Sequence, residues 1–149
     1  MNPFNFREAL LAKHAQHVVL IHFPIALFMA GVAFDFAAKW SKRSALAAAA
    51  YYNFLVAAIS APLVVATGLL AWQLQLEGQR LKGILLEHLV LGVASSAMIC
   101  IVWYVHLRSR RRPEQKLPSY RLPMELLAAG LLGITAHLGG YLSGVNISG

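Results

Sequence analysis

Four long apolar runs constrain this chain more than any other feature of its sequence. They lie at about 18–38, 45–74, 85–107 and 123–142, and each has roughly the 20 residues that a helix needs to cross a bilayer. Hydrophobic residues make up 58% of the 149 residues and charged residues 13%, so a soluble body of this size could not bury its apolar surface. We therefore predict an all-α integral membrane protein, a four-helix up-down bundle, as a single transmembrane domain over residues 1–149.

The distribution of basic residues predicts how the helices are oriented. The first and third loops hold nine of them, whereas the N-terminal segment and the second loop hold four. The nine are Lys39, Lys42, Arg43, Arg108, Arg110, Arg111, Arg112, Lys116 and Arg121. By the positive-inside rule, the first and third loops are cytoplasmic and both termini periplasmic in a bacterial inner membrane. The net charge of +7 is then explained by topology and by contact with the lipid bilayer, and we expect no nucleic-acid partner.

Histidines provide the main candidate for chemistry, because ionisable side chains within membrane helices are rare and usually functional. Neighbouring helices run in opposite directions, so four histidines should lie near the periplasmic face. These are His17, His22, His88 and His137. For the other two, His14 and His106, we expect interfacial or hydrogen-bonding roles.

Small residues share helix faces with several of these histidines. Positions three and four apart lie on one face, and His22 is followed on its face by alanines, while His137 lies in a stripe with Gly133 and Gly140. The second span contributes Gly68. Small residues allow close helix contact or leave space for a flat cofactor. We therefore predict that His22, His88 and His137 face the interior of the bundle.

Imidazoles from facing helices of an apolar bundle are typical ligands of haem b. We predict His22 and His88 as the axial, metal-binding pair, because the first and third helices are diagonal in an up-down bundle. His17 and His137 are the reserve ligands, and Gly68, Gly133 and Gly140 would border the cofactor. His17 and His22 lie about 140° apart around their helix, so both cannot serve one axial position. We expect one haem, with a second left open.

Several other polar or irregular positions have simpler interpretations. Asp35 lies one turn before Lys39, which favours a local ion pair. Glu87 stands beside His88, where it would either orient the imidazole or remain at the interface. The single cysteine, Cys100, is expected to pack in the interior, and Pro62 to kink the second helix.

Three segments resemble an uncharacterised bacterial membrane family, domain of unknown function 2231. His17-Val-Val-Leu-Ile-His22-Phe-Pro-Ile-Ala-Leu is similar to its opening signature, in which a proline stands where this chain has Val18. Thr67-Gly68-Leu-Leu-Ala-Trp72 and His137-Leu-Gly-Gly-Tyr-Leu-Ser-Gly-Val resemble its second-span end and closing segment, and His88 matches a histidine that opens its third span. Members are often joined to cytochrome c or Rieske-like modules, so the resemblance implies electron transfer.

The predicted function is that of a membrane b-type cytochrome with haem near the periplasmic face. We expect an electron-transfer subunit or anchor of a larger redox assembly rather than a stand-alone enzyme. Its partner would be a redox subunit or cytochrome c, and contact with quinone stays open. Two alternatives remain: a non-redox structural subunit whose histidines bond between helices, and a zinc- or copper-binding protein of the outer face.

Overall fold

The computed structural model describes residues 15–75, 78, 80–113 and 116–143, and these form four helices without a strand. The helices are α2 (Ala15–Ser41), α3 (Ser44–Gln75), α4 (Ile84–Arg110) and α5 (Arg121–Leu142). All four are long and apolar enough to cross a membrane. The predicted class, an all-α membrane bundle of four helices, is confirmed, and each helix lies within a few residues of its predicted span.

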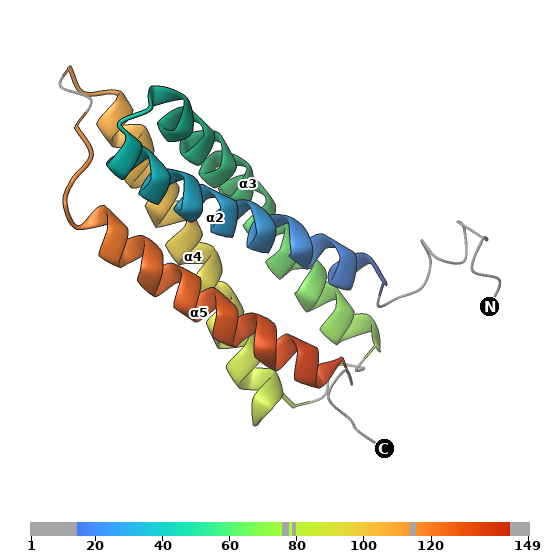
Figure 1. Cartoon of the computed structure of the whole chain (residues 1–149). Coiled ribbons are helices and arrows are strands. Elements are labelled where there is room, and N and C mark those ends of the chain that lie inside the picture. The colour runs from blue at the N-terminus through green and yellow to red at the C-terminus, as the bar shows by residue number, and fades with distance from the viewer. Residues whose placement is uncertain (1–14, 76–77, 79, 114–115, 144–149) are drawn as a thin grey trace.

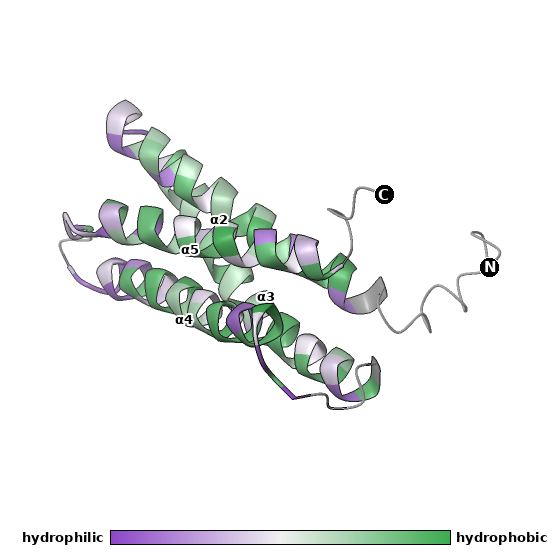
Figure 2. Ribbon diagram, turned by 90° about the horizontal axis from the view of Figure 1, so that it is seen from below, coloured by the Kyte–Doolittle hydropathy of each residue, from purple (hydrophilic) through white to green (hydrophobic). Residues whose placement is uncertain are grey.

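The helices form two hairpins that pack side by side (Figure 1). The most extensive contacts are those of α2 with α3 and of α4 with α5; α3 also packs on α4, and α2 touches α5 over a shorter stretch. We call the end with the α2–α3 and α4–α5 connections the basic end, and the end with the α3–α4 connection the His17 end. Figure 2 shows hydrophobic residues along the helices and hydrophilic ones concentrated towards their ends.

The buried core is confined to one stripe of each helix, and the outer surface is equally apolar. Phe28 of α2 and Phe54 of α3 are fully buried, with ring centroids 5.4 Å apart. Gly31 permits this contact, because a Cβ there would lie 2.7 Å from Phe54 Cε1. Large hydrophobic side chains such as Ile59 and Leu127 are exposed, as expected of a surface that faces lipid.

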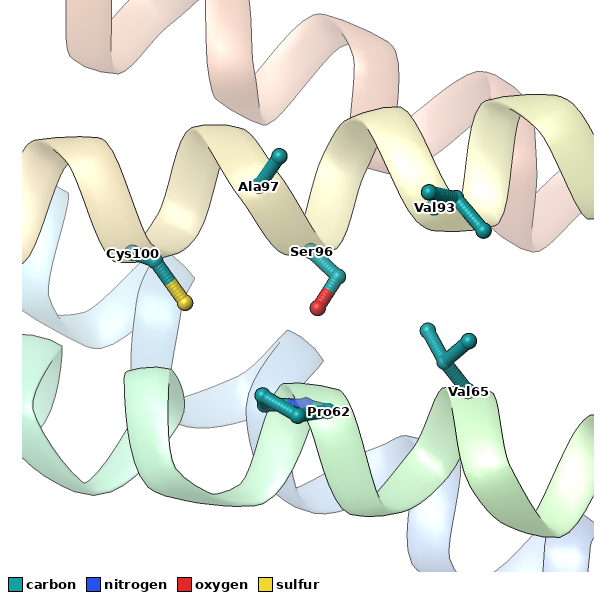
Figure 3. Close-up of a pocket in the computed structure, with 6 residues that line it drawn as sticks. All are labelled: Pro62, Val65, Val93, Ser96, Ala97 and Cys100. Carbon is teal, nitrogen blue, oxygen red and sulfur yellow. The ribbon is translucent and has the colours of Figure 1, made fainter.

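A side chain of α4 compensates for the proline inside α3. Pro62 has no N–H, so it cannot donate to the carbonyl of Ala58 four residues earlier. The Cys100 thiol donates to that carbonyl, with 3.7 Å between Sγ and the oxygen. Pro62, Cys100 and Ser96 border a groove of about 280 Å³ between the two helices, into which both α4 side chains point (Figure 3). Cys100 therefore satisfies a backbone acceptor as well as packing.

This contact predicts an energetic coupling between Cys100 and Pro62. Cys100→Ala removes the donor and should lower the free energy of unfolding by about 0.5–1.5 kcal/mol, apart from the loss of packing. In a Pro62→Ala background α3 regains its own N–H donor, so Cys100→Ala should cost less. Unfolding of the four proteins in detergent, analysed as a double-mutant cycle, measures the difference. Equal costs in both backgrounds would contradict the proposed hydrogen bond.

Candidate cofactor site formed by two histidines

Two of the four candidate histidines lie inside the bundle near the His17 end. His17 on α2 and His88 on α4 are both half-buried, and the charge on one ring would act on the other. His22 is exposed and donates from Nδ1 to the Val18 carbonyl of its own helix at 2.7 Å. His137 is exposed as well. The structure thus pairs His88 with His17, and the prediction that His22 and His137 face the interior is wrong.

The helix stripes explain which histidine of α2 turns inward. His17 lies in register with buried Pro24, Phe28 and Asp35, whereas His22 belongs to the neighbouring face. The alanines that follow His22 suggested an interior position. In the structure the interior stripe is marked by the large ring of Phe28 instead.

His88 is held by an acceptor that determines its tautomer. Its Nδ1 lies 3.1 Å from the backbone carbonyl oxygen of Thr135 on α5. A carbonyl oxygen can only accept, so Nδ1 carries the hydrogen and Nε2 keeps its lone pair. The Thr135 hydroxyl also lies 2.9 Å from Ser95 Oγ, which joins α4 to α5 beside the histidine.

His17 is held in the same manner by α3. Its Nδ1 lies 3.1 Å from Thr67 Oγ1, and the Thr67 hydroxyl donates to the Val64 carbonyl at 2.9 Å. The hydroxyl proton is therefore engaged, and Thr67 accepts from the Nδ1–H of His17. Within the described part of the chain, the Thr67 and Thr135 contacts of the two rings are made through Nδ1, and the Val64 backbone also lies within hydrogen-bonding reach of the His17 ring. An imidazole that donates from one nitrogen and leaves the other free is the arrangement of metal-ligating histidines.

A glycine lies against each imidazole. A Cβ at Gly139 would lie 2.9 Å from His88 Cε1, and one at Gly68 would lie 3.0 Å from His17 Cε1. Gly68 was among the predicted site residues. Gly133 and Gly140 were also predicted, but a Cβ on either would have no atom within 4 Å among those the structure describes. On α5 the glycine that contacts His88 is Gly139 instead.

Glu87 was expected either to orient the His88 imidazole or to remain at the interface, and its side chain is exposed. The Thr135 carbonyl orients that imidazole instead. His14 lies outside the described residues. Threonine in a membrane helix is a common partner for polar groups of its neighbours, so the sequence favours interhelical hydrogen bonds rather than chemistry for Thr67 and Thr135. The structure confirms such bonds for both, and their partners include His17 and His88.

A second polar cluster lies at the basic end. Arg121 of α5 donates from Nε to Asp35 Oδ2 of α2 at 2.7 Å, and His106 Nε2 of α4 lies 2.8 Å from Glu125 Oε1 of α5. The predicted ion pair of Asp35 with Lys39 is wrong, because Asp35 points into the bundle and Lys39 is exposed. His106 has the hydrogen-bonding role expected for it.

Comparison with known proteins identifies one family. The family model described as "Predicted membrane protein (DUF2231)" matches residues 13–146, which include both histidines of the pair. No curated protein and no solved structure matches the chain.

The hydrogen bonds predict an uncommon protonation state for both histidines. In ¹⁵N NMR spectra of histidine-labelled protein in micelles, His17 and His88 should be protonated at Nδ1, whereas neutral imidazole in water favours Nε2. Thr67→Val removes the hydroxyl acceptor of His17, leaves the Val64 backbone as its neighbouring acceptor, and should shift that ring alone towards the Nε2–H form. His17→Gln and His88→Gln variants assign the signals. Nε2–H forms for both rings in the unsubstituted protein would contradict the assignment.

Proposed function

The chain belongs to the DUF2231 family, whose description names a membrane location and no activity, and from its own residues we propose that it is a b-type membrane cytochrome. His17 and His88 would be the axial ligands of one haem b. The observation that carries the proposal is that each ring offers a free Nε2 lone pair while its Nδ1–H is held by a neighbouring helix. The two ligands come from different hairpins, on either side of the bundle interior.

The number of protein ligands favours haem over a bare metal ion. Haem supplies four nitrogens of its own and needs at most two further ligands from the protein. A zinc site needs three or four protein ligands. A bare ion would need at least three histidine, cysteine or acidic side chains close together. Among the described residues such a group lies at the basic end, and it contains neither His17 nor His88. Two imidazoles in apolar surroundings therefore fit haem better than zinc or copper.

The neighbouring residues would each have a defined task. Thr67 and Thr135 accept from Nδ1–H, which fixes ring orientation and makes Nε2 a stronger ligand. Gly68 and Gly139 let the imidazoles lie against the helix backbones. Arg80 and Lys82 are exposed at the same end, where cationic side chains would pair with propionates. When bound, the haem iron supplies one-electron transfer.

Topology suggests where electrons would enter and leave. With the basic end in the cytoplasm of a bacterial inner membrane, both termini and the histidine pair would face the periplasm. A periplasmic redox subunit or a cytochrome c would then reach the site, and quinone would reach it from the bilayer. The connections between helices are short, so an electron-transfer subunit or anchor suits the chain better than a stand-alone enzyme.

An absorption spectrum tests the proposal. Protein expressed with sufficient haem and purified in mild detergent should show a Soret band that shifts on addition of dithionite. His17→Ala and His88→Ala should each lose this low-spin spectrum, because one axial ligand is missing. His22→Ala and His137→Ala are matched controls on α2 and α5 and should retain it, since both side chains are exposed.

Free imidazole separates a lost ligand from a damaged fold, because it should restore the spectrum of His88→Ala. The proposal is wrong if the unsubstituted protein shows no Soret band. It is also wrong if the two alanine variants keep the band unchanged.

The glycine contacts give an independent prediction. Gly139→Ala should lower the haem retained per chain through purification, because the new methyl group displaces His88. Gly140→Ala should have no such effect, since its Cβ would meet open space. Both changes raise helix propensity by about 1 kcal/mol, so a difference between them reports on the imidazole and not on the helix. Pyridine haemochrome assay against protein concentration measures it, and equal retention would count against the placement of His88.

A further inference from the structure

Three side chains with metal-ligating atoms converge at the basic end from three different helices. They are Asp35 of α2, His106 of α4 and Glu125 of α5, and one ligand atom of each lies within 4.8 Å of the others. Their exposed fractions are 1%, 3% and 0%, so the cluster is shielded from both lipid and water. Charged groups this deeply buried require partners.

One oxygen of this cluster lacks a partner. Glu125 Oε1 interacts with His106, but Glu125 Oε2 is fully buried and has no hydrogen bond among the described residues. A carboxylate oxygen in that position loses its hydration without compensation. A cation bound between the three side chains would supply the missing interaction.

The surroundings hold two of the three ligands in place. Arg121 donates from Nε to Asp35 Oδ2, and the His106 ring packs against Phe54 with centroids 4.8 Å apart. Carboxylates that bind metals are usually hydrogen-bonded in this way by a second residue. Once the proton between His106 and Glu125 is released, two carboxylates and one guanidinium leave a net negative charge in the cluster, which attracts a divalent cation.

We propose that Asp35, His106 and Glu125 bind a divalent first-row transition ion of the Zn²⁺ or Mn²⁺ class. One imidazole nitrogen and two carboxylate oxygens suit such ions, whereas Ca²⁺ and Mg²⁺ prefer oxygen ligands throughout. No thiolate is present to favour Cu(I), because Cys100 bonds to α3. The ion would take the place of the proton between His106 Nε2 and Glu125 Oε1. That proton would be released to solvent, while His106 stays neutral with its hydrogen on Nδ1.

Such an ion would connect helices that otherwise touch little. Asp35 and Glu125 belong to α2 and α5, which contact each other over a short stretch. The site is also separate from the histidine pair, because Asp35 lies about 27 Å along α2 from His17. The proposed metal site can therefore be tested independently of haem binding.

Zinc binding to the full-length purified protein tests the proposal. Protein stripped with chelator and dialysed against Zn²⁺ should retain one zinc ion per chain, measured by inductively coupled plasma mass spectrometry. Glu125→Gln and Asp35→Asn should each weaken zinc binding at least tenfold while keeping the shape of the side chain. Glu87→Gln and His22→Gln, which alter exposed residues of the same types, should bind as the unsubstituted protein does.

Zinc X-ray absorption of the unsubstituted protein provides a readout that needs no variant. We expect one imidazole and the remaining ligands as oxygen, at about 2.0–2.2 Å. Two or more imidazoles at the zinc would overturn the proposal and assign the ion to another site. Absence of stoichiometric zinc, or unchanged affinity in Glu125→Gln, would overturn it as well and leave the cluster as a proton-bearing polar network.

Discussion

A bilayer offers no water to the polar groups of a spanning helix, so each of them must find its partner within the protein. This requirement accounts for the interhelical contacts of the bundle. The Ala58 carbonyl, left without its donor by Pro62, is satisfied by Cys100. Asp35 is neutralised by an arginine 86 positions later in the chain. Partners of this kind specify which helices touch, which apolar contacts alone cannot do when lipid is as apolar as the core.

The same requirement produces a repeated arrangement in the two hairpins. In α2–α3, a histidine near the start of the first helix bonds to Thr67 and lies on Gly68. In α4–α5, His88 bonds to Thr135 and lies on Gly139. Each hairpin thus orients one imidazole by itself, and packing of the two hairpins brings the imidazoles close enough for the charge on one ring to act on the other. Under the proposed function, the axial ligands would be assembled by that packing.

Each of the first and third helices carries two ionisable groups on one inward stripe. His17 and Asp35 are 18 residues apart, as are His88 and His106, which is about five turns of α-helix. Both stripes therefore have a histidine at the His17 end and an ionisable group at the basic end, with apolar residues such as Phe28 and Ile99 between them. This spacing places two separate groups of ionisable side chains at opposite ends of one interior.

Sequence alone determined the four spans, their alternating direction and the end of the bundle at which each histidine within the described residues lies. The length of an apolar run, and a residue's position along it, translate directly into position along the helix. The sequence did not determine which side of a helix faces inward. The helices are apolar on all sides, so no periodic change from polar to apolar distinguishes the core from the lipid surface. Only tertiary packing decided that His17 rather than His22 faces His88, that Gly139 rather than Gly140 touches it, and that Asp35 pairs with Arg121. The first two choices depend on a rotation of about 100–140° around a helix axis, and contact with the neighbouring helix sets that rotation. The third depends on which side chain α5 brings to Asp35.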